Sequence, residues 1–158
     1  MIAPATTSDL PEMAGLMAAS TLLRRYRVDQ SAALNSLTNA YTSGDVLLVC
    51  REQSLIGLAW LSFARRVLDA AAYLRLLLVA DDARGTGTGS RLLAAAETRA
   101  TEAANHLYLL ATTDNTIARG FYERHGYRHV GDLPGLVWPD LDEALYHKVL
   151  RPYAERLP

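Results

Sequence analysis

Residues 76–93 read LLLVADDARGTGTGSRLL, and this stretch decides how the chain is expected to fold. An apolar run passes without a break into a turn with three glycines in five residues, and then into a helix-forming tract. Glycine costs conformational entropy, so this density indicates a backbone that takes positive φ or approaches a ligand closely. The N–H groups that begin the next helix would face an anion, aided by the helix dipole. The stretch therefore predicts strand, anion-binding loop and helix, with a phosphate-bearing cofactor as the ligand.

Length, charge and cysteine content limit the classes of protein to consider. The chain has 158 residues and no linker-like stretch, so we predict a single domain over residues 1–158. Its formal net charge of −1, from 16 basic and 17 acidic residues, argues against a nucleic-acid partner. The one cysteine, Cys50, cannot form an intramolecular disulfide, and we expect it to be buried on a strand. The sequence shows no leader-like segment and no membrane span, so we expect a cytoplasmic protein without a membrane partner.

The hydrophobic pattern on both sides of the loop predicts an α/β fold with a mixed, mostly antiparallel sheet flanked by helices. Short connections between the early strands favour antiparallel neighbours, whereas the apolar strand, helix and strand over residues 70–112 favour a parallel pair with a right-handed crossover. Strands are expected at residues 2–5, 46–50, 55–63, 70–79, 106–112, 127–130 and 144–149. Helices are expected from Asp9 through Leu22, over 30–41 after Asp29, over 90–104 and over 116–124, with Asp114 or Asn115 as the last helix's N-cap. Residues 131–143 are expected to be a long connection.

Two nucleotide-binding alternatives use similar glycine-rich loops. A P-loop needs Gly-Lys-Ser/Thr so that the lysine reaches the phosphates, but Gly89 is followed by Ser90 and Arg91, which excludes this alternative. A dinucleotide-binding fold needs its third glycine one position later than it occurs here, although Asp114 does stand near a strand end. A nicotinamide-dinucleotide-binding enzyme therefore stays open as a remote alternative.

A second motif, NTIARGFYERHGY at residues 115–127, makes the pattern specific. Together with the loop it resembles the GNAT family of N-acetyltransferases over essentially the whole chain. The loop matches the family's Arg/Gln-x-x-Gly-x-Gly/Ala at Arg84, Gly87 and Gly89. The second signature is an asparagine, a Phe-Tyr pair whose tyrosine follows seven residues later, and then a glycine with an aromatic residue, matched by Asn115, Phe121, Tyr122, Gly126 and Tyr127.

The resemblance implies acetyl-CoA as cosubstrate, no metal, and direct transfer of the acetyl group to a primary amine in a ternary complex. Backbone N–H groups would cradle the pyrophosphate at Arg84, Gly85, Thr86, Gly87, Thr88, Gly89 and Ser90. The preceding strand, at Leu77, Leu78 and Val79, would pair with the pantetheine arm, and one of its amides would polarise the thioester carbonyl. Asn115 would contact the cofactor arm or serve only as a helix N-cap.

Tyr122 is the expected catalytic residue. A thiolate must leave, and a phenol with an ordinary pKa near 10 can donate a proton to it at neutral pH. Without the family pattern, an aromatic side chain that anchors the helix to the sheet is the simpler interpretation. The general base is not apparent, because Leu110 stands where some relatives carry a glutamate. Tyr73, His106 and Thr112 are conceivable relay residues, each with an ordinary structural alternative.

The acceptor is left open as a small-molecule or peptide amine. Arg24, Arg25 and Arg27 would favour an anionic acceptor, whereas the acidic residues of 131–143 would favour a cationic one, and both segments are also consistent with solvated surface. Trp138 could contact substrate or a partner subunit, and the family resemblance suggests a homodimer. The missing glutamate supports a second hypothesis, a catalytically weak acyl-CoA-binding regulatory domain.

Overall fold

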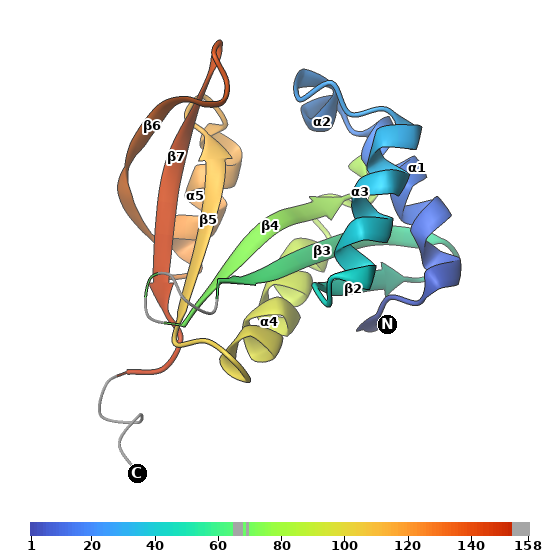
Figure 1. The fold of residues 1–158 in the computed structure, drawn as a ribbon, viewed down its shortest axis with the longest axis horizontal. Coiled ribbons are helices and arrows are strands. Elements are labelled where there is room, and N and C mark those ends of the chain that lie inside the picture. The colour runs from blue at the N-terminus through green and yellow to red at the C-terminus, as the bar shows by residue number, and fades with distance from the viewer. Residues whose placement is uncertain (65–67, 69, 153–158) are drawn as a thin grey trace. The chain divides into compact units, whose positions relative to one another are not determined.

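The computed structural model of the protein describes residues 1–64, 68 and 70–152. Along the chain, three α-helices follow the first strand, three strands come next, and helices and strands then alternate up to the final strand pair (Figure 1). The strands are β1 (Ile2–Pro4), β2 (Val46–Arg51), β3 (Leu55–Ala64), β4 (Ala71–Val79), β5 (His106–Thr112), β6 (Arg128–Trp138) and β7 (Leu141–Val149). The α-helices are α1 (Leu10–Ala19), α2 (Thr21–Arg25), α3 (Gln30–Thr42), α4 (Thr88–Thr101) and α5 (Thr116–Arg124), with 3₁₀ turns at Thr7–Asp9 and Asp81–Ala83.

The strands form one seven-stranded sheet in the order β1-β2-β3-β4-β5-β7-β6. β1, β2 and β3 pair antiparallel, β4 and β5 pair parallel, and β7 runs antiparallel to both β5 and β6. The predicted mixed, mostly antiparallel sheet is confirmed, together with its single parallel strand-helix-strand unit. This topology is not the doubly wound parallel sheet that a dinucleotide-binding fold requires.

The chain divides into two compact units. Unit 1 consists of Met1–Ser62 and Arg75–Arg99, and unit 2 of Phe63–Leu74 and Ala100–Pro158. Unit 1 therefore holds the glycine-rich loop, and unit 2 holds α5 with the second sequence motif. Among the described residues, no helix is long and apolar enough to cross a membrane.

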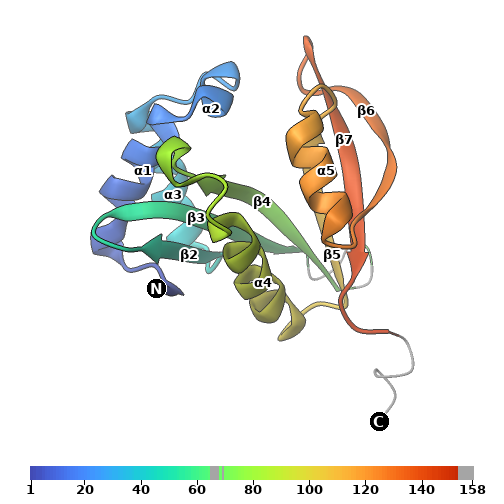
Figure 2. The same cartoon turned by 180° about the vertical axis from the view of Figure 1, so that it is seen from behind.

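Unit 1 has a helical layer on each face of its strands. Alternate residues of β2 and β3 bury against the N-terminal helices in one hydrophobic cluster (Figure 1). α4 lies on the other face (Figure 2), where a Cβ added at Gly57 would stand only 2.8 Å from the side chain of Leu92. The cluster on the first face includes Met13, Met17, Leu37, Leu47, Val49, Leu58 and Trp60. Cys50 is fully buried on β2, as expected from the sequence.

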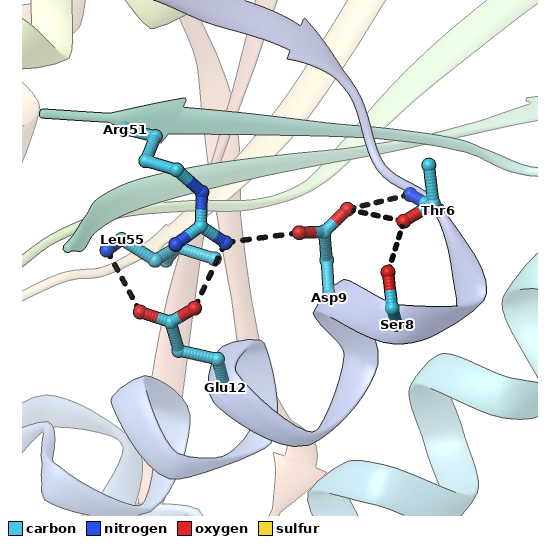
Figure 3. A network of polar contacts seen from close by, with 6 residues as sticks. All are labelled: Thr6, Ser8, Asp9, Glu12, Arg51 and Leu55. Carbon is cyan, nitrogen blue, oxygen red and sulfur yellow. Dashed lines mark hydrogen bonds and ion pairs between the residues drawn. The ribbon is translucent and has the colours of Figure 1, made fainter. Parts of the chain in front are cut away.

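A polar network fastens the start of α1 to the β2–β3 hairpin (Figure 3). Arg51 bridges two carboxylates, at 2.9 Å to Asp9 and 2.8 Å to Glu12. The backbone N–H of Leu55 donates to Glu12 at 2.8 Å, and the N–H and hydroxyl of Thr6 donate to Asp9 at 2.8 and 2.7 Å. Donors that favour the charged form hold the pKa of both carboxyls below their ordinary values, chiefly through Thr6 at Asp9 and Leu55 at Glu12.

The first helix is shorter than the sequence pattern predicts. Instead of continuing through Leu22, the helix stops at Ala19, and Ser20 takes an extended ψ of 125°. The Ser20 side chain accepts a hydrogen bond from the N–H of Leu23 at 3.4 Å and so begins a separate helix, α2. The next predicted helix start is confirmed, because the carboxylate of Asp29 caps α3 by accepting from the N–H of Ala32 at 2.8 Å.

Unit 2 contains the largest error of the sequence-based prediction. Residues 131–143, expected to be a long connection, lie mostly in the strands β6 and β7. Gly131, Pro134 and Gly135 resemble turn residues, yet β6 is the outermost strand of the sheet, where proline is tolerated. Its register with β7 shifts between Leu133 and Trp138, and Gly135 takes a φ of 59° inside that irregularity. The bulge and the edge position thus allow these two glycines and the proline to lie within a strand.

Candidate active site

The loop before α4 has the backbone that its glycine content predicts. Gly85 and Gly87 take φ values of 77° and 81°, and a Cβ at either would meet no atom within 4 Å. Crowding therefore does not explain these glycines, and the left-handed conformation does. Within the part of the chain that the structure describes, the N–H groups of Gly85, Thr86 and Gly87 have no hydrogen-bond acceptor, whereas Arg91 donates to the carbonyl of Gly87 at 3.1 Å.

A chain of side-chain hydrogen bonds holds the loop in this shape. The hydroxyl of Thr86 donates to the carbonyl of Ala83 at 2.7 Å and lies 2.9 Å from the hydroxyl of Thr88. Thr88 is buried, and its hydroxyl also accepts from the guanidinium of Arg91 at 2.9 Å. The side chains thereby satisfy one another and leave the main-chain N–H groups for a ligand.

Two arginines flank the loop. Arg84 pairs with Asp81 at 2.6 Å and Arg91 approaches Glu52 at 3.9 Å, and all four side chains are more than half exposed. Exposed ion pairs of this kind contribute little, so either guanidinium can turn to a phosphate at small cost. Free N–H groups, a helix N-terminus and two cations fit the pyrophosphate of a CoA thioester.

The strand that leads into the loop changes its pairing along its length. The described pairs between β4 and β5 run over Ala71–Leu74, whereas on its other side β4 has β3 as its neighbour in the sheet. Leu78 is buried in the core cluster, while Leu77 and Val79 are half-buried. The backbone of this second half is thus suited to pairing with an extended ligand, which is the role that the resemblance assigns to it.

Tyr122, in unit 2, sits within a group of aromatic rings. Its ring centroid lies 5.3 Å from that of Phe121 and 5.6 Å from that of Tyr127, both edge-on. Burial raises the pKa of the Tyr122 phenol well above its ordinary value, and the nearby Tyr73 adds to the shift. The group is therefore a protonated donor at neutral pH, and no described residue hydrogen-bonds its hydroxyl. The sequence suggests two roles for Tyr122, an aromatic anchor of the helix and a proton donor, and this environment is compatible with both.

Asn115 begins the helix that carries Tyr122. Its side-chain oxygen accepts from the N–H of Ala118 at 3.1 Å, so the N-cap predicted from the sequence is confirmed. The cap uses only the oxygen, and the side-chain NH₂ group keeps its donors for a second partner.

A network around Tyr146 was missed by the sequence analysis. Tyr146, fully buried on β7, accepts from Arg119 Nε at 3.0 Å and donates to the carboxylate of Glu123 at 2.8 Å. Arg119 also donates to the carbonyl of Thr113 at 2.9 Å. The spacing of Arg119 and Glu123 on one helix face was a usable signal, but nothing in the sequence pattern links them to Tyr146.

The relay residues proposed for the base are distributed over unit 2. His106 Nδ1 lies 2.9 Å from His147 Nε2, and burial together with His106 lowers the pKa of His147. Tyr73 lies close enough to Tyr122 to influence its pKa, and Thr112 is buried. A carboxylate is absent at Leu110, as the sequence shows, and the neighbouring strand β7 carries the buried Glu143 opposite Thr112.

Known proteins resemble this chain in sequence and in fold. The profile of the acetyltransferase (GNAT) family matches residues 16–127. The blasticidin-S acetyltransferase of Streptomyces morookaense is 46% identical over 59 residues, which are 37% of this chain and 43% of that protein. The chain thus spans less than half the length of this relative.

Two solved structures show the same fold at low identity. The ribosomal-protein-alanine N-acetyltransferase from Brucella melitensis superposes with a TM-score of 0.78 and 22% identity, over 94% of this chain and 99% of that one. An aminoglycoside 6′-N-acetyltransferase complexed with coenzyme A gives 0.77 and 17%, over 96% and 98%. Because the family profile covers most of the chain and the fold agrees, the protein belongs to the GNAT acetyltransferase family.

Proposed function

We propose that the protein is an acetyl-CoA-dependent N-acetyltransferase that transfers the acetyl group directly to a primary amine. The observation that carries the proposal is the loop, where Gly85 and Gly87 hold left-handed conformations and leave N–H groups without acceptors in the described chain. Arg84, Thr86, Thr88, Gly89 and Ser90 complete the proposed pyrophosphate site. The proposal treats residues 1–158 as one N-acetyltransferase domain.

The transfer can be assigned to residues of this chain as follows. The backbone of Leu77, Leu78 and Val79 would hold the pantetheine arm, and an N–H of this segment would stabilise negative charge on the carbonyl oxygen. The amine nitrogen forms a bond to the carbonyl carbon as the carbon–sulfur bond breaks. The Tyr122 hydroxyl would give its proton to the leaving sulfur, and the proton lost by the amine restores the phenol. No metal takes part in this scheme.

The relatives support this proposal without fixing the acceptor. The relatives are named for acetylating blasticidin S, an aminoglycoside and an alanine of a ribosomal protein, and these acceptors are those of the relatives. Small-molecule and peptide amines therefore both stay in consideration. A homodimer and a cytoplasmic location are further proposals, which light scattering and cell fractionation would test.

The test is Tyr122→Phe, with Tyr127→Phe as a matched control in the same group of rings. In an amine-dependent assay of CoA release, Tyr122→Phe is expected to lower kcat on the order of 10²-fold. The Kd of acetyl-CoA, measured by calorimetry, should stay within about twofold of the wild type, since the hydroxyl acts on the leaving sulfur. Tyr127→Phe should keep both values. An unchanged kcat in Tyr122→Phe removes this residue from the mechanism.

The second candidate is a regulatory domain that binds acyl-CoA without efficient catalysis. The specific observation in its favour is Leu110, which leaves β5 without the carboxylate that some relatives use. One assay of acetyl-CoA binding and consumption distinguishes the two candidate functions. Acetyl-CoA that binds but is not consumed with any primary amine supports the regulatory domain, and turnover supports the transferase.

A further inference from the structure

We propose that Arg75 determines acceptor specificity, and that the acceptor carries an anionic group, a carboxylate or a phosphate, beside the amine to be acetylated. The inference deepens the proposed function and rests on it. It starts from an arginine that the sequence motifs do not include.

Arg75 occupies an unusual place for a cation. It is the only charged residue of β4, an interior strand whose sequence over residues 71–79 is AAYLRLLLV. The parallel pairing with β5 ends at Leu74, so Arg75 is the first residue beyond the paired segment. The side chain is exposed although its strand lies inside the sheet. Because the side chain is exposed, the guanidinium can meet a ligand.

The guanidinium is held in place without being neutralised. Its carbon lies 4.8 Å from the ring centroid of Trp60, in a cation–π contact. Trp60 is itself fixed, because it is 6% exposed and its indole N–H donates to Asp45 at 2.7 Å. Arg75 forms no hydrogen bond or ion pair with the described residues. The Trp60 ring holds the guanidinium without using up its N–H donors, which can bind a carboxylate or phosphate.

Trp60 connects Arg75 with the hydrophobic cluster of unit 1. Trp60 shares its hydrophobic cluster with Leu23 and Tyr26, which lie at and just after α2. The same segment carries Arg24, Arg25 and Arg27, the arginines that the sequence analysis connected with an anionic acceptor. Arg75 contacts this cluster through Trp60.

Three of the acidic residues that favoured a cationic acceptor are engaged or buried within unit 2. Asp132 pairs with His129 at 2.8 Å, and Asp142 accepts from the N–H of Gly135 at 3.0 Å. Glu143 is 2% exposed. These three carboxylates are used within the β6–β7 pair, which leaves Arg75 as the better-supported recognition element.

Arg75 also stands close to the proposed donor strand. Leu77 follows two residues later, a rise of ~7 Å along an extended strand. A compound whose amine and anionic group are separated by a few bonds would therefore fit between this guanidinium and the acetyl donor.

The experiment compares paired amines that differ in the anionic group: alanine with alaninamide, and O-phosphoethanolamine with ethanolamine. CoA release is measured for the wild type, Arg75→Ala, Arg75→Lys and the control Arg128→Ala, which removes an exposed arginine from β6. Arg75→Ala should raise KM about tenfold or more for the anionic member of the preferred pair and leave the neutral member within about twofold. Arg75→Lys should recover part of the loss, and Arg128→Ala should resemble the wild type. The preferred pair identifies carboxylate or phosphate.

The result that overturns the inference differs from the result that overturns the proposed function. Failure of acetyl-CoA to bind in calorimetry counts against the function. If acetyl-CoA binds and turns over, but Arg75→Ala raises KM equally for both members of a pair, the inference about Arg75 is wrong. Turnover of neutral amines alone also counts against it. If no pair turns over, the Tm is measured with CoA and each amine present. The inference predicts that an anionic member raises the Tm of the wild type but not that of Arg75→Ala. The absence of any shift overturns it.

Discussion

Tyr146 on β7 donates its hydroxyl to the carboxylate of Glu123 on α5 at 2.8 Å, while Arg119 donates to the same hydroxyl at 3.0 Å. One buried phenol thus joins the helix that carries Tyr122 to the strand beneath it. The contact lies within unit 2, so it fixes the helix on its own part of the sheet. The orientation of Tyr122 and Asn115 depends on this attachment.

We expect Tyr146→Phe to lower the free energy of unfolding by about 1–2 kcal/mol, since it leaves the donor of Arg119 and the acceptor of Glu123 without a partner. Urea unfolding followed by circular dichroism measures this loss. Tyr108→Phe is the control, because no described residue hydrogen-bonds that hydroxyl, and it should change stability by less than about 0.5 kcal/mol. Equal losses in the two variants would show that the Tyr146 network does not stabilise the helix.

Gly87→Ala should weaken acetyl-CoA binding beyond any effect of backbone strain. Gly44 supplies the matched control: its φ is 80°, against 81° at Gly87, and a Cβ at either position meets nothing within 4 Å. Both alanine variants carry a similar conformational cost of about 1 kcal/mol. We expect Gly87→Ala to raise the Kd of acetyl-CoA at least about tenfold and Gly44→Ala to leave it unchanged, as calorimetry would show. Similar Kd values for the two variants would exclude the loop from the cofactor site.

Asn115→Asp separates the helix cap from a contact with the cofactor. Aspartate caps a helix as well as asparagine does, so Tm should be maintained, while Asn115→Ala should lose about 1 kcal/mol. Aspartate has no NH₂ donors and adds a negative charge, so a cofactor contact would appear as weaker acetyl-CoA binding with unchanged stability. Normal acetyl-CoA affinity in Asn115→Asp would leave Asn115 with the capping role alone.

The network around Arg51 predicts how stability depends on pH. The folded pKa values of Asp9 and Glu12 lie below their ordinary values of 3.8 and 4.5. Both carboxylates therefore stabilise the fold above their unfolded pKa values, and this stabilisation is lost as the pH falls through the folded ones. Unfolding free energies measured from about pH 6 to pH 2 should decline more steeply in the wild type than in the double variant Asp9→Asn, Glu12→Gln. Parallel curves would mean that these carboxyls do not couple to folding.

Local sequence rules predicted the elements whose signals lie close together in the chain. Residues 106–112 and 116–124 were predicted with the observed bounds, because a continuous apolar strand and an N-cap asparagine mark them directly. The loop followed from its glycines in the same way. The break at Ser20 was missed because a single serine cap competes with an uninterrupted apolar pattern. A strand was predicted at 127–130, but the continuation of β6 to Trp138 was missed because Gly131, Pro134 and Gly135 disrupt a strand pattern unless the strand is an edge strand with a bulge.

The side-chain contacts between different strands and helices could not be predicted from the sequence. The stacking of Arg75 on Trp60 joins residues of different strands, and their side-chain arrangement is set by tertiary packing. Tyr146 likewise meets Arg119 only after α5 has packed on β7. Motif spacing therefore located the proposed cofactor and catalytic residues, whereas the residues that position α5 and the proposed acceptor-specificity residue, Arg75, required the structure.

The most direct test of the central claim is a calorimetric titration of the purified protein with acetyl-CoA, with CoA and NADH in parallel. The account predicts that acetyl-CoA binds with a Kd on the order of micromolar and that NADH gives no heat of binding. Binding of NADH alone, or no binding of any of the three ligands, would contradict it.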